Sequence, residues 1–141
     1  MNAVGVAVLV GVLALATAVG LVLRARDGRP RTGGTAAGGW ALAGLPPNGD
    51  QRVLLLQLSS PVCAPCRQTS GVLADLTART PGVTHHEIDV AERPDVARAL
   101  GVMRTPTVVA FDRAGIELVR VSGVPRSADL EAALAPELRR T

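Results

Sequence analysis

The chain has 141 residues and a formal net charge of +3 at pH 7, which is enough for one small domain with some additional sequence. All 15 basic residues are Arg, so no Lys is available as a Schiff-base or general-base group. Trp40 and Phe111 are the only aromatic residues, and they are too few for the stacking platform on which single-stranded nucleic acid binds. No nucleic-acid partner is therefore expected.

Residues 1–23 are predicted to form a transmembrane anchor. The run from Ala3 to Leu23 carries no charge, and a helix of that length rises about 30 Å, the thickness of the hydrocarbon core of a bilayer. A cleaved signal peptide is the alternative, because Ala16 to Ala18 (ATA) fits a cleavage pattern. The segment has no positive region before it, however, and apolar sequence continues past Ala18. We expect an uncleaved, single-pass anchor in the cell membrane.

The residues that flank this segment predict its orientation. Arg24, Arg26, Arg29 and Arg31 follow it closely, with Asp27 as the only acid among them. Cytoplasmic flanks carry the excess of Arg and Lys. The rest of the chain is therefore expected on the cytoplasmic side, with an extracytoplasmic location as the alternative.

Residues 24–50 are interpreted as a basic stretch followed by a linker rich in Gly and Pro. The part from Gly28 to Asp50 has the composition of a flexible connection. Within it, WALAG (Trp40–Gly44) could be a short edge strand or a docking segment, and the sequence does not decide between them.

Residues 51–141 are expected to form the folded domain. Apolar patterning predicts strands at 52–60, 83–90, 105–112 and 116–123, and helices at 67–80, 93–102 and 127–140. DRAG (112–115) is a hairpin turn signal, and Ser127 is the expected N-cap of the last helix. The order β-α-β-α-β-β-α indicates an α/β fold with a central mixed sheet and helices on both faces.

Cys63 and Cys66 are the only cysteines, and their spacing allows a small disulfide ring, half of a metal site, or a pair of buried structural thiols. His85 and His86 are adjacent, so on a strand they point to opposite faces and cannot chelate a metal together. A structural zinc ion needs four ligands, so no metal site is expected. Both histidines are interpreted as solvated strand residues.

The element order, CAPC at Cys63–Cys66 and TPT at Thr105–Thr107 together resemble the thioredoxin family, over roughly Arg52 to Leu138. The resemblance implies a thioredoxin-like fold in which Cys63 and Cys66 are the redox pair. It also implies a cis peptide bond before Pro106, with the Thr105 backbone pairing with a substrate peptide. No cofactor is expected.

The thiol chemistry explains why these residue types would be needed. A thiolate attacks a disulfide sulfur and forms a mixed disulfide, and the N-terminus of a helix stabilises the thiolate of Cys63. Cys66 lies one turn further along and can resolve the intermediate. Pro65 fits in the first turn, where no N–H is needed, and Arg67 keeps the positive charge that usually follows the motif.

Several positions depart from the family pattern. Gln57 stands where a buried Asp usually aids proton transfer, Val62 replaces a Trp, and Ala64 replaces a Gly. The first strand and helix of the full fold are missing or reduced to WALAG. These departures argue against fast turnover with a general thioredoxin reductase, but they leave the thiol pair intact.

The resulting hypothesis is a membrane-tethered thiol–disulfide oxidoreductase that acts as a reductant on protein substrates and is recharged by a thiol reductant or a reductase. One alternative is a thioredoxin-fold adaptor that uses its thiols little. The other is an extracytoplasmic thiol oxidoreductase of the cytochrome c maturation type. Arg104, next to Thr105, either borders the substrate groove or is an ordinary exposed loop residue.

Overall fold

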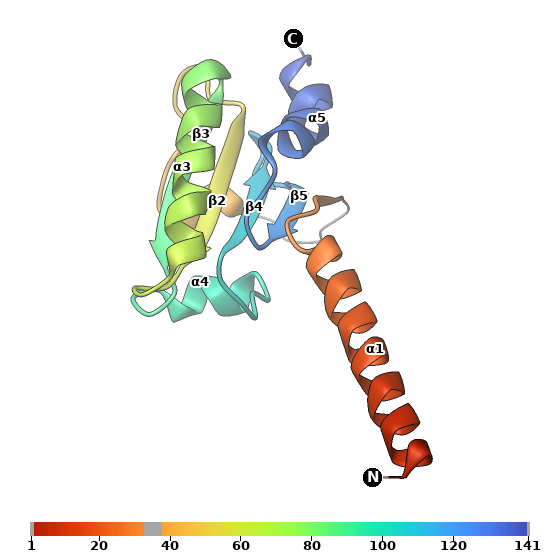
Figure 1. Cartoon of the computed structure of the whole chain (residues 1–141). Helices are drawn as coiled ribbons and strands as arrows, with labels where there is room; N and C mark the ends of the chain where they lie inside the picture. Colours follow the sequence, from red (N-terminus) through yellow and green to blue (C-terminus); the bar gives the residue numbers. More distant parts are fainter. Residues whose placement is uncertain (1, 33–37, 141) are drawn as a thin grey trace.

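The computed structural model describes residues 2–32 and 38–140, and within them the chain forms five helices and five strands (Figure 1). In chain order these are α1 (Ala3–Arg26), β1 (Arg31–Thr32), α2 (Gly39–Ala43), β2 (Val53–Ser59), α3 (Ala64–Arg79), β3 (Val83–Asp89), α4 (Pro94–Ala99), β4 (Thr107–Phe111), β5 (Glu117–Ser122) and α5 (Ser127–Leu138). From β2 onward this is the predicted order of strands and helices.

The strands form one mixed sheet in the order β1-β5-β4-β2-β3. Strands β2 and β3 are parallel, whereas β2–β4, β4–β5 and β1–β5 pair antiparallel. Residues of α3 and α5 pack in one apolar cluster on one face of the sheet, and those of α2 and α4 pack in a second cluster on the other. The fold is therefore thioredoxin-like, with the expected mixed sheet and helices on both faces.

Strand β2 occupies the centre of this core, and all of its residues are buried. Leu55 belongs to the cluster with α3 and α5, whereas Leu56 belongs to the cluster with α2 and α4. Successive side chains of a strand point to opposite faces, so a strand covered on both faces must be apolar almost throughout. Gln57 and Ser59 are the polar exceptions, and both lie beside the thiol pair.

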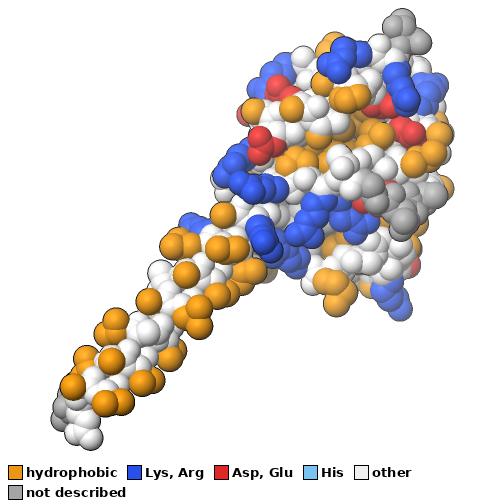
Figure 2. Space-filling view, turned by 90° about the vertical axis from the view of Figure 1, so that its right-hand side faces the viewer, with side chains coloured by type: hydrophobic (Ala, Val, Ile, Leu, Met, Phe, Trp, Pro, Cys, Tyr) orange, Lys and Arg blue, Asp and Glu red, His pale blue; other side chains and the backbone are white. Residues whose placement is uncertain are grey.

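Helix α1 stands apart from the domain (Figure 1). It has 24 residues, an 18-residue stretch within it has a mean hydropathy of 2.8 with none of that stretch buried, and by length and composition it could cross a membrane. Figure 2 shows apolar side chains along the helix and Arg side chains gathered where it joins the domain.

The expected flexible linker contains ordered structure in its described part, which is a correction. Arg31 and Thr32 pair with β5, and the first four residues of WALAG lie in the short helix α2, with Gly44 as its C-cap, rather than in an edge strand. Trp40 is only 5% exposed, and its indole Nε1 donates a hydrogen bond to the Asp112 carbonyl at 2.8 Å. Burying a large aromatic ring in the core outweighs the flexible composition around it. Residues 33–37 of the predicted linker lie outside the described residues.

The N-cap of α5 also differs from the prediction. Arg126 occupies the N-cap position, and Ser127 is the first helical residue. The Ser127 hydroxyl instead donates to Glu131 and accepts from Arg79. The predicted hairpin turn is present, because the Asp112 side chain accepts from the Ile116 N–H at 2.8 Å and Gly115 has φ +81°.

Candidate active site

Cys63 and Cys66 lie where the central strand β2 passes into helix α3, and their sulfurs are joined in a disulfide with an S–S distance of 2.06 Å. Cys63 is the N-cap of α3, and its Sγ accepts a hydrogen bond from the Cys66 N–H at 3.1 Å. Such an N–H, together with the positive end of the helix dipole, stabilises negative charge on sulfur. The local structure thus suits a thiolate at Cys63.

The two sulfurs differ in access. Cys66 is 3% exposed, whereas Cys63 is half-buried and the preceding Val62 is 96% exposed. Pro65 lies in the first turn of α3, as its missing N–H allows. An incoming partner can therefore reach Cys63 more readily than Cys66.

The loop before β4 lies next to this motif. The Thr105–Pro106 peptide bond is cis, and the Thr105 hydroxyl lies 3.1 Å from that of Ser60, in the loop that leads to Cys63. The Gly123 N–H donates to the Pro106 carbonyl at 2.8 Å. Within residues 2–32 and 38–140, the backbone N–H and carbonyl of Thr105 form no backbone hydrogen bond.

A groove of about 450 Å³ joins these parts to the end of α1. It is lined by Arg24, Asp27, Pro65, Arg104, Thr105, Pro106, Gly123 and Val124. Of the residues singled out from the sequence, Pro65, Thr105, Pro106 and Arg104 therefore meet in one place. Arg104 also forms an ion pair with Asp27, with Nη2 to Oδ1 at 2.6 Å.

Arg67 lies in a second hollow beside the motif. Both cysteines line this hollow together with three carboxylates, Glu87, Asp89 and Glu92. Arg67 is exposed and supplies the positive charge there. The cysteines thus line an acidic hollow, and Pro65 between them lines the groove that contains cis-Pro106.

Beneath the motif, the buried Gln57 organises a polar network. Its Nε2 lies 3.0 Å from the Cys66 carbonyl, 2.8 Å from Ser59 Oγ, 3.0 Å from Ser70 Oγ and 3.2 Å from Glu87 Oε1. These are more acceptors than its two N–H groups can serve at once, so the network can rearrange. Gln57 cannot exchange a proton, but it connects Cys66 to side chains that can.

His85 belongs to this network, which corrects its interpretation as a solvated strand residue. It is half-buried, and its Nε2 lies 3.0 Å from Gln57 Oε1. Burial lowers the pKa of His85 below its usual value, although the carboxylate of Glu87 acts in the opposite direction. The clue in the sequence was Gln57 itself, because a buried amide needs polar partners from the neighbouring strand.

Ser70 and Glu87 are the other members that the sequence did not identify. The Ser70 hydroxyl lies 3.0 Å from the Cys66 carbonyl and 2.9 Å from Glu87 Oε2. Glu87 is the register partner of Gln57 across β2 and β3. Throughout the part of the chain that the structure describes, no group of three His, Cys, Asp or Glu residues could hold a metal ion.

Comparison with known proteins matches residues 48–136 to the thioredoxin family model. An Arabidopsis thaliana protein with a thioredoxin name is 31% identical over 80 residues, which are 57% of this chain and 51% of that protein. The thioredoxin of Chlamydia pneumoniae is 32% identical over 72 residues, covering 51% of this chain and 70% of that one. This chain therefore spans about half the length of the Arabidopsis relative.

Among solved structures, a mutant thioredoxin from Halobacterium salinarum superimposes with a TM-score of 0.61 at 25% identity. The match covers 77% of this chain and 92% of that structure. The similarity thus extends over nearly the whole of that thioredoxin structure.

Proposed function

This chain belongs to the thioredoxin family, and from that premise we propose that it is a membrane-tethered thiol–disulfide oxidoreductase that reduces disulfides in protein substrates. One observation carries the proposal: Cys63 and Cys66 form a disulfide at the N-terminus of α3, with the Cys66 N–H directed at Cys63 Sγ. A fixed structural disulfide has no need of an exposed approach to one sulfur, whereas an exchanging pair does.

The reaction runs in two exchanges. The Cys63 thiolate attacks one sulfur of a substrate disulfide, forms a mixed disulfide and releases the other substrate sulfur as a thiolate. The Cys66 thiolate then attacks Cys63 Sγ, closes the Cys63–Cys66 disulfide and releases the second substrate sulfur. Two electrons pass to the substrate, and both released thiolates take up protons. A thiol reductant or a reductase must then return two electrons to the pair.

The groove beside Pro65 is where we propose that the substrate peptide lies. The Thr105 N–H and carbonyl have no backbone partner among the described residues, so they are free to pair with an extended peptide. Pro106 and Pro65 would contact its side chains. In the acidic hollow, Arg67 would stabilise negative charge that develops at the thiol pair.

The tether in this proposal is α1, which is apolar on all sides and long enough to cross a bilayer. The Arg residues after it favour a domain on the cytoplasmic side. A reducing role agrees with that location, because glutathione and thioredoxin systems keep cytosolic thiols reduced. Topology reporters fused after Thr141 test this point, and a reporter that is active only outside the membrane would contradict it.

Disulfide reduction by the full chain tests the function. With dithiothreitol as electron donor, the protein should accelerate reduction of insulin disulfides, and Cys63→Ser should reduce the rate to that of the buffer. Cys66→Ser should instead accumulate a mixed disulfide with the substrate, visible as a species of higher mass on a non-reducing gel. Activity that survives Cys63→Ser, or a wild-type protein without activity, would favour the adaptor alternative.

A further inference from the structure

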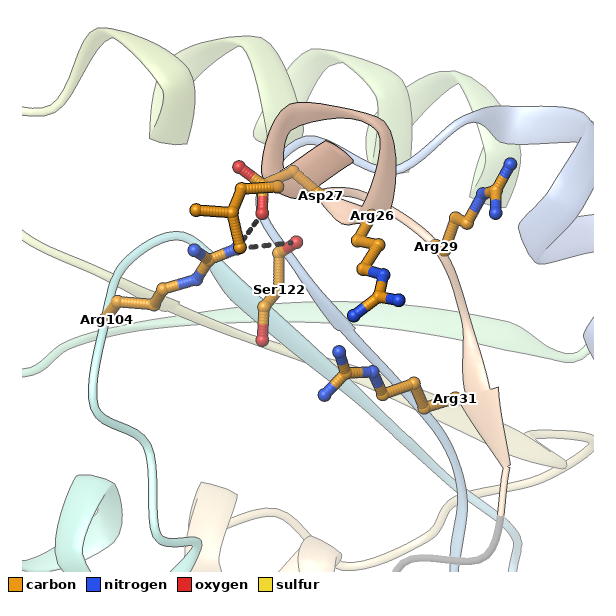
Figure 3. Close-up of a pocket in the computed structure, with 7 residues that line it drawn as sticks. Arg26, Asp27, Arg29, Arg31, Arg104 and Ser122 are labelled. Atoms are coloured by element: carbon orange, nitrogen blue, oxygen red, sulfur yellow. Dashed lines mark hydrogen bonds and ion pairs between the residues drawn. The ribbon is translucent and has the colours of Figure 1, made fainter. Parts of the chain in front are cut away.

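A basic pocket of about 280 Å³ lies where α1 meets the sheet (Figure 3). It is lined by Leu23, Arg26, Asp27, Arg29, Arg31, Arg104 and Ser122. The positive side chains come from the end of α1, from the connection to β1, from β1 itself and from the loop before β4. The thiol chemistry proposed above uses none of Arg26, Arg29 and Arg31.

The charges of this basic pocket are not balanced. Asp27 is its only acid, and the Asp27 carboxylate is already bound to Arg104 at 2.6 Å. Over residues 2–32 and 38–140, no ion pair joins Arg26, Arg29 or Arg31 to a carboxylate. Four guanidinium groups and one carboxylate leave three positive charges around one cavity.

Two of these cations face each other. In Figure 3 the guanidinium groups of Arg26 and Arg31 point toward the same space, whereas Arg29 points away and Arg104 reaches Asp27 and the Ser122 carbonyl. Like charges that converge repel each other, and an anion bound between them offsets that electrostatic repulsion. Guanidinium groups offer paired N–H donors that match the oxygens of a phosphate group.

The position of the pocket favours a phosphate group that belongs to a membrane lipid. Leu23, which lines it, is the last residue of the apolar run, so the pocket lies at the level where α1 would leave the hydrocarbon. Leu23 also lines an apolar depression on α1 together with Ala18, Val19 and Val22. Leu23 therefore borders both a cationic pocket and an apolar depression, the two surfaces that a lipid headgroup and its acyl chain require.

We propose that this basic pocket binds the phosphate group of an anionic phospholipid, with Arg26 and Arg31 as its principal ligands and an acyl chain along α1. The lipid would occupy the joint between anchor and domain. The proposal rests on the membrane span proposed for α1, but not on the thiol chemistry.

The test measures the melting temperature of the full-length protein in a zwitterionic detergent, by circular dichroism, against three additives. Short-chain phosphatidylglycerol should raise the melting temperature in a saturable manner, whereas short-chain phosphatidylcholine should not. Inorganic phosphate should act only at much higher concentration.

In R26Q/R31Q the half-saturating concentration of phosphatidylglycerol should increase about 30-fold, from the loss of two Arg contacts. R98Q/R140Q removes the same charge elsewhere and should behave like the wild type.

Several results would overturn the proposal. Equal stabilisation by phosphatidylcholine, or an equal loss in R98Q/R140Q, would show that the pocket does not select an anionic headgroup. Saturation by inorganic phosphate at the same concentration would assign the pocket to a soluble anion instead. If R26Q/R31Q is not folded without lipid, R31Q alone should weaken phosphatidylglycerol binding about 5-fold, and an unchanged value contradicts the proposal. Alkaline extraction of wild-type membranes tests the span separately, since a protein released by it lacks the tether.

Discussion

Gln57 shows how one buried residue can organise the surroundings of the thiol pair. It occupies the position where the resemblance led us to look for a buried Asp, and its amide bridges Cys66 and Glu87. A carboxylate at this position would face the carboxylate of Glu87, whereas an amide donates to it. The amide at position 57 therefore suits the carboxylate of Glu87 on the neighbouring strand.

Gln57→Glu should accordingly destabilise the protein. The isosteric carboxylate loses both N–H donors and is buried beside Glu87, at a cost of about 2–4 kcal/mol at pH 7. The free energy of unfolding from urea titration measures this loss, which should shrink as the pH falls and the new carboxyl is protonated. Gln51→Glu is the control, because Gln51 accepts a hydrogen bond from the Asn48 N–H and a carboxylate can do the same. Equal stability of Gln57→Glu and Gln51→Glu would contradict this account of Gln57.

His85 should make stability depend on pH. Burial lowers its pKa in the folded protein, so the unfolded chain takes up a proton first as the pH falls below about 6.5. Stability contributed by the neutral ring is thus fully present above that value and is lost below it. The difference in unfolding free energy between pH 7 and pH 5 should be smaller in His85→Gln than in the wild type. His86→Gln is the control, and a wild-type slope in His85→Gln would count against the role of burial.

At the scale of elements, α2 completes the core from outside the predicted domain. Gly39 lies against the ring of the fully buried Phe111, and a Cβ at Gly39 would lie 2.1 Å from Phe111 Cγ. The helix can approach the sheet closely only because residue 39 has no side chain. Residues 39–43 are therefore part of the folded domain.

Gly39→Ala should destabilise the protein by about 1–3 kcal/mol, since the new methyl group overpacks the core. Gly71→Ala provides a matched control in α3, where a Cβ would meet nothing within 4 Å. There the same change should stabilise the helix by about 0.5–1 kcal/mol. Thermal unfolding of both variants measures the difference, and equal melting temperatures would show that α2 does not pack on the core in solution.

Elements defined by local signals could be predicted from the sequence, whereas contacts between distant residues could not. Strand β2 and the motif at Cys63 were predictable, because a continuous apolar run and a cysteine pair at a helix start are local signals. The burial of Trp40 was not predicted, because the Gly-rich composition around it is typical of a flexible segment. The residues that contact its side chain are distant in the sequence. His85 was misjudged for a similar reason: its partner Gln57 lies on another strand, and only the parallel register of β2 and β3 brings the two together.

At the scale of the whole molecule, the joint between α1 and the domain (residues 27–30) is short. It is bonded to β5 and to the loop before β4. Only four residues separate the end of α1 at Arg26 from β1 at Arg31. The Gly28 N–H donates to the Ser122 carbonyl at 2.7 Å, and Asp27 pairs with Arg104. Gly28 has φ +75°, and a Cβ there would lie 2.2 Å from the Val124 carbonyl oxygen, so the joint requires glycine.

This joint directs the active site toward the side on which the anchor lies. In Figure 1, α1 extends from the domain toward the same side as the Ala64 end of α3, and the groove beside Pro65 is lined partly by Arg24 of α1. With α1 in a bilayer, the thiol pair would be held close to the membrane surface. Substrates whose disulfides lie near that surface would then be the favoured ones.

Lengthening the joint tests this consequence. A Gly/Ser insertion of about twelve residues between Arg26 and Asp27 adds a flexible connection and leaves the fold of the domain unchanged. In liposomes, reduction of a disulfide placed a few residues outside the apolar segment of a model transmembrane peptide should slow about 5- to 10-fold, because the effective concentration of the thiol pair at the surface falls. Reduction of soluble insulin should be unchanged, which controls for intact chemistry. If both rates stay equal to the wild type, the orientation set by Gly28 and Asp27 has no part in substrate choice.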